Sequence, residues 1–228
     1  MLECQSFESK DIALENIEKI SKSLGLPLKV GKLSQGNLCF VNNREVRPEF
    51  RESVTEIEII DYCYALYHSS KFWKKIGFQN DDLSQYPLPT NDSKFWKLVS
   101  FGAKLRQLHL KDSIAQEQII TQFPLKGNNK VLLSNVRYSP LKERNSNGLI
   151  LGNLYINETQ YFKNVPEKAW DFRWKKEKPA QRWLQDQADC VLTLEAILEY
   201  QNLIAILTQT ATIIEEIKKV DATKLKKL

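Results

Sequence analysis

Residues 130–157 read KVLLSNVRYSPLKERNSNGLILGNLYIN, and here the hydrophobic pattern changes from the helical spacing of the preceding chain to that of strands. Residues 130–139 and 149–157 are rich in β-branched, aromatic and aliphatic side chains, and the polar segment KERNSNG between them is typical of a hairpin connection. The segment WDFRW at 170–174 alternates bulky and polar residues, which predicts a third strand. The sequence therefore predicts a small, mostly antiparallel sheet at about residues 130–175.

The chain before this sheet is mainly helical in its apolar spacing. Residues 10–24 place aliphatic side chains on one face and are followed by Gly25, which is a helix stop signal. Residues 56–76 form a long apolar stretch without Gly or Pro, and residues 94–110 share one apolar face, so both predict core helices. One short strand is expected near residues 38–41.

Two further helices are predicted after the sheet. Pro179 favours the first turn of a short helix, PAQRWLQDQ, and Thr193 is placed to cap a long final helix that runs to about Lys219. The apolar residues of that last helix spread over more than one face, so it could pack on two surfaces or on a second chain.

The predicted fold class is α+β, with a helical N-terminal part, a small mostly antiparallel sheet and a long C-terminal helix. We expect residues 1–228 to form one compact unit. The alternative is a division into a helical subregion, 1–125, and a sheet-plus-helix subregion, 126–228.

Composition excludes several classes of protein. With 42% hydrophobic and 27% charged residues in 228, the chain has the profile of a globular protein, and no apolar run approaches the roughly 18 residues of a membrane span. The N-terminus lacks the pattern of a secretory signal, so we expect a cytoplasmic protein without a membrane partner. The four cysteines form no CxxC pair, and phosphate loops, HExxH and nucleophile elbows are absent, so we expect neither a metal site nor a self-contained active site.

Positive charge lies in the second half of the chain. The net charge is +5, yet residues 1–60 carry a net charge of −2, from 8 basic and 10 acidic side chains. Residues 126–144 hold five basic side chains against one acidic side chain, and residues 163–182 hold seven against three. This asymmetry, beside aromatic residues, is typical of a protein with a polyanionic partner, although an ordinary solvated surface has the same signature.

The stretch 155–185 combines amide, basic and aromatic side chains. Asn and Gln carry hydrogen-bonding edges suited to bases, Arg can form bidentate contacts with guanine or phosphate, and Lys can contact phosphates. The alternative is that the rings belong to the core and the amides to turns. The candidate DNA contacts, including two basic residues upstream, are Lys130, Arg137, Asn157, Thr159, Gln160, Tyr161, Arg173, Lys175, Lys176, Lys178, Gln181 and Arg182.

The order of six sequence blocks resembles the C-terminal specificity region of type ISP restriction–modification enzymes and related adenine-specific DNA methyltransferases. The LYINETQYFKNVPEKAWDF block is close to the wording of that family, and PAQRWLQDQ is similar to its PAQKWLKDR. The blocks are LENIEKISKSLGLPLK (14–29), EIIDYCYALYHSSKFWKKI (58–76), YPLP (86–89) with FWKLVSFGAKLRQLHL (95–110), LYINETQYFKNVPEKAWDF (154–172), PAQRWLQDQ (179–187) and LTLEAILEYQNLIAIL (192–207).

The resemblance implies a DNA target-recognition domain that binds duplex DNA sequence-specifically and is not itself an enzyme. It implies no cofactor in this chain, with S-adenosylmethionine used by an associated methyltransferase domain or subunit. The chain departs from the pattern of the family at two places. HSP becomes HSS at 68–70, and GGYQPAQKWLKDRKGR becomes KKEKPAQRWLQDQADC at 175–190.

Two other hypotheses remain open from the residues. The chain could be a non-catalytic module that docks on a methyltransferase or helicase partner through its apolar helices. It could also be an enzyme with an unrecognised site around Cys63, His68 and His109.

Overall fold

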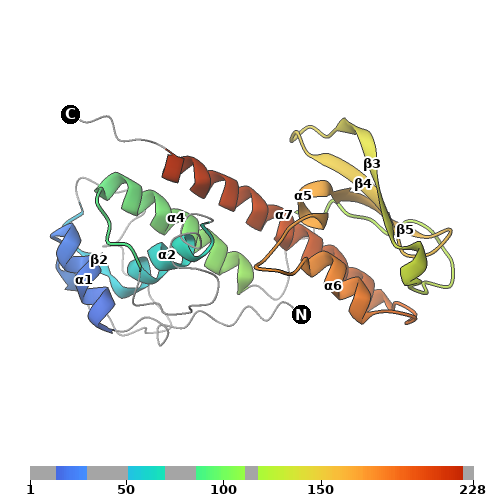
Figure 1. Ribbon diagram of the computed structural model, residues 1–228, viewed down its shortest axis with the longest axis horizontal. Helices are drawn as coiled ribbons and strands as arrows, with labels where there is room; N and C mark the ends of the chain where they lie inside the picture. Colours follow the sequence, from blue (N-terminus) through green and yellow to red (C-terminus); the bar gives the residue numbers. More distant parts are fainter. Residues whose placement is uncertain (1–13, 30–50, 70–85, 111–117, 223–228) are drawn as a thin grey trace. The chain divides into compact units, whose positions relative to one another are not determined.

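The computed structural model describes residues 14–29, 51–69, 86–110 and 118–222 (Figure 1). It divides the chain into two compact units. The sheet unit consists of Met1–Glu3 and Lys111–Thr212, and the helical unit consists of Cys4–Leu110 and Ile213–Leu228. The described part of the chain contains no helix that is long and apolar enough to cross a membrane.

The helical unit contains the two segments that the sequence predicts as core helices, α2 (Glu56–Tyr67) and α4 (Asp92–His109). Thr55 begins α2 as its N-cap, and its side chain and the Glu58 side chain exchange hydrogen bonds with each other's backbone N–H groups in a capping box. Asn91 caps α4 by a single hydrogen bond, in which its side-chain oxygen accepts the Lys94 N–H at 2.9 Å. The described elements are α1 (Leu14–Leu24), β1 (Leu28–Lys29), β2 (Val54–Thr55), α2 (Glu56–Tyr67) and α4 (Asp92–His109), and β1 pairs with β2 in parallel.

The packing of α4 on α2 depends on a close backbone approach. A Cβ atom at Gly102 would overlap with the backbone carbonyl of Asp61, so only glycine fits at this point of α4. The side chain of Asp61 is buried and accepts a hydrogen bond from Nε of Arg106 at 2.6 Å. A buried carboxylate needs such a partner, because an unpaired charge in the core is costly.

The sheet unit places a three-stranded antiparallel sheet beside helices (Figure 1). Its strands are β3 (Arg137–Arg144), β4 (Ile150–Tyr155) and β5 (Tyr161–Pro166), and they lie in the order β3-β4-β5, so β4 is central. Tyr200 on α7 contacts the rings of Phe162 and Trp183 at 4.7 Å between centroids, which joins the sheet, α6 and α7 in one core. The elements are η6 (Leu133–Asn135), β3 (Arg137–Arg144), β4 (Ile150–Tyr155), β5 (Tyr161–Pro166), α5 (Glu167–Trp170), α6 (Pro179–Asp186) and α7 (Leu194–Ala222).

The strand register gives the sheet two different faces. Successive side chains of a strand point to opposite sides. Leu154 and Phe162 are fully buried and form the inner face against the core. Tyr155 and Tyr161 therefore lie on the opposite, outer face, where the register pairs Arg137 with Tyr155 and Tyr155 with Tyr161.

Two predicted strands are placed differently by the structure. Within 130–139, only the end is in a strand: residues Leu133–Asn135 form a 3-10 turn, and β3 continues into the segment predicted as a connection. Pro140 is tolerated because β3 is an edge strand, where a missing N–H need not break the ladder. The third strand is β5, not WDFRW, because the chain turns into α5 directly after Pro166.

The fold class is confirmed as α+β, with a small antiparallel sheet and a long C-terminal helix. The predicted helices correspond to α1, α2, α4, α6 and α7, and Thr193 caps α7 as expected, through Ala196 N–H. The helix predicted over 56–76 is wrong in its end: α2 ends at Tyr67 with His68 as its C-cap, and residues 70–76 lie outside the described residues. The expected strand near residues 38–41 also lies outside them. The units meet in sequence at 110–111 rather than near 125, and the end of α7 belongs to the helical unit.

Candidate nucleic-acid interface

An open hollow of about 400 Å³ lies in the sheet unit between the loop that precedes α6 and α6 itself. Five of the twelve candidate DNA contacts line it. Two further residues, Glu177 and Gln185, complete the lining. The five candidate contacts are Arg173, Lys176, Lys178, Gln181 and Arg182.

The local sequence explains why these side chains reach the hollow. Pro179 sits in the first turn of α6, and Ala180, Trp183 and Leu184 bury the inner side of that helix in the core. At a period of 3.6 residues, positions 181, 182 and 185 must then face away from the core. The helix thus carries its polar side chains to the hollow.

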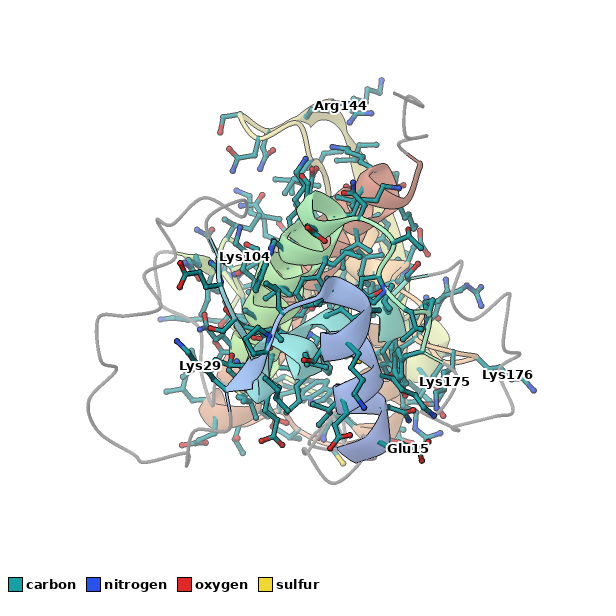
Figure 2. The ribbon with its side chains drawn as sticks, turned by 90° about the vertical axis from the view of Figure 1, so that its left-hand side faces the viewer. Glu15, Lys29, Lys104, Arg144, Lys175 and Lys176 are labelled. Atoms are coloured by element: carbon teal, nitrogen blue, oxygen red, sulfur yellow. The ribbon has the colours of Figure 1, made fainter. Side chains whose placement is uncertain are left out.

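A tight turn shapes the other wall of the hollow. The backbones of Trp174 and Glu177 exchange two hydrogen bonds, at 2.9 and 3.0 Å. Lys175, at the first central position of this turn, has φ of +53°. This left-handed conformation is one that glycine adopts freely and lysine rarely does. Figure 2 shows the side chains of Lys175 and Lys176 extending outward from the ribbon.

The charge of the hollow is strongly positive. Arg173, Lys176, Lys178 and Arg182 stand against Glu177 alone, which gives the lining a net charge of +3, four minus one. Lys178 pairs with Asp171 at 2.8 Å and Arg182 with Asp186 at 3.0 Å, both near the solvent. Within the described residues, no carboxylate pairs with Arg173 or Lys176. Exposed ion pairs contribute little stability, so a phosphate could displace these carboxylates at small cost.

Asn157 and Gln160 have a different role from the one that the sequence predicts. Both are buried, at 5% and 1% exposure. The Asn157 side chain caps the turn between β4 and β5 by accepting the N–H groups of Thr159 and Gln160, and it donates to the Lys130 carbonyl. The Gln160 side chain accepts a hydrogen bond from the Asn129 N–H, and its Nε2 donates to the Leu125 carbonyl and to Oδ1 of Asn129. Because the amide groups of Asn157 and Gln160 already form hydrogen bonds inside the protein, neither side chain can read a base in this structure.

The other candidate contacts lie apart from the lining of the hollow. Arg137 and Tyr161 are on the outer face of the sheet, and Thr159 is exposed in the turn between β4 and β5. Lys130 is 3.8 Å from the exposed carboxylate of Asp189. Sequence reasoning missed Tyr155 on the outer face. The sequence did contain a signal for this position. Tyr155 lies between the aliphatic residues Leu154 and Ile156, and side chains that alternate along a strand point to opposite faces.

The cysteine and histidines that suggested an alternative active site are in the helical unit. Cys63 is buried, and burial raises the pKa of its thiol, which leaves little reactive thiolate. Burial lowers the pKa of His68 to about 3 and that of His109 to about 4. Both rings contact Tyr64, whose hydroxyl is 2.7 Å from Nδ1 of His109. Within the described ranges, no three His, Cys, Asp or Glu side chains are grouped as metal ligands.

A comparison with protein families agrees with the order of the sequence motifs. The sequence model of the Type ISP C-terminal specificity domain matches residues 14–216, which is most of the chain. The chain belongs to this family. No curated protein matches its sequence.

Three solved structures resemble this specificity domain at low identity. A nuclease-deletion mutant of the Type ISP enzyme LlaGI in complex with a DNA substrate mimic is 16% identical, with a TM-score of 0.40 over 77% of this chain and 14% of the other. The DrdV–DNA complex is 15% identical, with a TM-score of 0.44 over 77% of this chain and 18% of the other. The Type ISP enzyme LlaBIII bound to DNA is 17% identical, with a TM-score of 0.37 over 73% and 11%. The chain spans less than a fifth of each of these proteins.

The departures of this specificity domain from the GGYQPAQKWLKDRKGR pattern coincide with unusual backbone geometry. Lys175 and Asp189 occupy two glycine positions of that pattern. Both have positive φ, +53° and +61°. The chain thus retains a backbone suited to glycine while carrying side chains at both positions.

Replacing Lys175 with glycine is therefore expected to raise the free energy of unfolding by about 1 kcal/mol, because the left-handed conformation is strained for a residue with a Cβ atom. Urea titration followed by circular dichroism measures this change. Lys176→Gly is the matched control, since φ of Lys176 is not positive. Equal stabilisation by both variants would show that the strain at Lys175 is not the cause.

Proposed function

We propose that this chain is a DNA target-recognition module that binds duplex DNA sequence-specifically through its sheet unit. The observation that carries the proposal is the convergence of Arg173, Lys176, Lys178, Gln181 and Arg182 on one hollow with a net charge of +3. Membership of a specificity-domain family supports it. A DNA backbone requires cations at the surface, and arginine and glutamine add the hydrogen-bonding edges that distinguish bases.

The division of labour follows from the same proposal. The chain supplies recognition and no catalytic group, and an adenine methyltransferase domain or subunit supplies the chemistry with S-adenosylmethionine. Such an enzyme must take its target base out of the stack, and a module that holds the flanking duplex keeps the base and the active site in register. In this chain, the phosphate contacts of the hollow would set that register.

The proposal predicts a loss of DNA binding when the hollow loses its arginines. Arg173→Ala and Arg182→Ala should each weaken binding, by about 1–3 kcal/mol where the residue makes a bidentate base contact. Fluorescence anisotropy with a labelled pool of random 30-base-pair duplexes measures this at low and at physiological salt. Lys104→Ala, on α4 in the helical unit, is the matched loss of one exposed charge (Figure 2).

Sequencing the DNA that is retained at physiological salt gives the recognised motif. Non-specific affinity falls steeply with salt, so a motif that survives the change separates recognition from simple charge attraction. Affinity for both arginine variants equal to that of the wild type would remove the hollow from the interface. Absence of binding at low salt would contradict the proposal as a whole.

One observation favours a second function, docking on a protein partner. Val191, Leu194 and Leu198 are exposed at 62%, 68% and 48% near the start of α7. Their spacing of three and four residues places the two leucines on one side of the helix. If DNA binding is absent, this apolar strip becomes the leading candidate for a contact with the methyltransferase or helicase partner.

A further inference from the structure

The outer face of the β3-β4-β5 sheet carries a row of three side chains, one from each strand. Arg137, Tyr155 and Tyr161 are consecutive partners in the strand register. The guanidinium carbon of Arg137 lies 3.8 Å from the centre of the Tyr155 ring. The ring of Tyr155 is in turn 5.1 Å from that of Tyr161. None of the three lines the hollow beside α6.

This arrangement holds an arginine in place without neutralising it. Stacking on a ring fixes the plane of the guanidinium and covers one of its faces, while the N–H groups at its edge stay directed outward. Among the described residues, Arg137 has no carboxylate partner, and its one side-chain hydrogen bond is a long contact of 3.5 Å to the Asn135 carbonyl. The N–H fork of Arg137 is therefore pre-organised to bind a pair of acceptor atoms.

The surroundings of Arg137 fit an anionic partner. The outward-facing residues of the paired strand segments are Arg137, Ser139, Leu151, Asn153, Tyr155, Tyr161 and Lys163, and no carboxylate is among them. The two tyrosines are only partly buried, and Arg137 and Lys163 are exposed. Arg137 and Lys163 give this set of residues a positive charge, which is complementary to the charge of a nucleic acid.

We propose that this outer face is a second DNA-contact surface, in which Arg137 contacts duplex DNA and Tyr155 is the positioning residue that holds it. The inference rests on the proposed function, because it names an additional contact to the same partner. The acceptor pair is either O6 and N7 of guanine or two oxygens of a phosphate, since both match the spacing of the guanidinium fork.

The test measures the affinity of the full-length chain for the random duplex pool in five variants. Arg137→Ala should weaken binding about tenfold, the size of one bidentate contact. Tyr155→Leu, which removes the ring, should weaken it several-fold, whereas Tyr155→Phe keeps the ring and should bind within about twofold of the wild type. Arg137→Lys keeps the charge but lacks the fork, so it should not restore wild-type affinity. Arg144→Ala is the matched control, since Arg144 is an exposed arginine of the same strand.

A double-mutant cycle separates positioning from direct contact. If Tyr155 acts through Arg137, Tyr155→Leu has no further effect once Arg137 is alanine. An equal loss in both backgrounds would show that Tyr155 contacts DNA by itself, which overturns its positioning role. Thermal unfolding checks that each variant is folded. If Tyr155→Leu is unstable, Arg137→Ala still tests the inference, because Arg137 is exposed and its substitution should not disturb the fold.

The salt dependence and the selected motif distinguish the two acceptors. If Arg137 contacts a phosphate, Arg137→Ala lowers the slope of log affinity against log salt by about one. If it contacts guanine, the slope is retained and one position of the motif loses its preference. If Arg137→Ala binds as tightly as the wild type while Arg173→Ala binds more weakly, the inference is overturned and the proposed function stands. The same holds if Arg144→Ala weakens binding as much as Arg137→Ala does. Absence of binding by the wild type overturns both.

Discussion

Gly102→Ala is expected to lower the free energy of unfolding by about 3 kcal/mol or more, which is a large share of the stability of a domain of this size. An alanine Cβ atom at this position would overlap with the backbone carbonyl of Asp61 on α2. Because the obstacle is backbone rather than a flexible side chain, α4 and α2 must separate. Their separation would also strain the buried ion pair between Asp61 and Arg106.

The sign of this effect distinguishes packing from helix propensity. In an exposed helix, alanine is favoured over glycine by about 1 kcal/mol, so propensity alone predicts stabilisation. Ser100→Ala, at an exposed position of the same helix, is the matched control and should be neutral or slightly stabilising. Urea titration of both variants gives the two free energies. A Gly102→Ala variant as stable as the wild type would mean that α4 does not approach α2 as closely as described.

Gln160→Ala is expected to lower the free energy of unfolding by about 3 kcal/mol and to act through folding rather than through DNA contact. The Gln160 side chain is 1% exposed. Its Oε1 accepts the Asn129 N–H at 2.8 Å, and its Nε2 donates to the Leu125 carbonyl at 3.0 Å. Alanine would remove the partners of the Asn129 N–H and the Leu125 carbonyl, which are part-buried hydrogen bonds, and would open a cavity at the buried position of the Gln160 side chain.

Two comparisons sharpen the prediction for Gln160. Gln160→Glu keeps the accepting oxygen but directs a carboxylate at the Leu125 carbonyl, so it should be nearly as harmful as alanine. Thr159→Ala changes the exposed neighbour and should alter the free energy of unfolding by less than about 0.5 kcal/mol. If Gln160→Ala were fully stable but bound DNA weakly, the internal role assigned to this amide would be wrong and the role of reading bases would return.

The helices were predictable because their signals are local. α7 begins after a capping threonine, α6 begins at a proline, and Gly25 follows α1 with a positive φ of +65°. The strands were harder. Residues 130–136 have strand-like composition but lie outside the three-stranded sheet, and Lys130 forms only an isolated bridge with Val191. Strand pairing depends on distant partners, so composition alone could not choose between WDFRW and β5.

In the candidate site, too, local features could be predicted from the sequence and features that depend on distant residues could not. Charge clustering in the sequence was enough to select the residues around the hollow, because cations on a short loop and an exposed helix face cannot lie far apart. Composition could not separate Gln181, which lines the hollow, from Gln160, which is buried in the core. Both are amides in the same polar stretch. Their difference arises from which strand or loop meets each side chain.

The sequence alone was sufficient for the family, the α+β class, the presence of the main helices and the location of positive charge, because each depends on residues that are neighbours along the chain. Only the tertiary structure revealed the close approach at Gly102, the burial of Asn157 and Gln160, and the row formed by Arg137 with two tyrosines. These features join segments that are far apart in sequence, where backbone geometry and register, rather than residue type, fix which atoms meet.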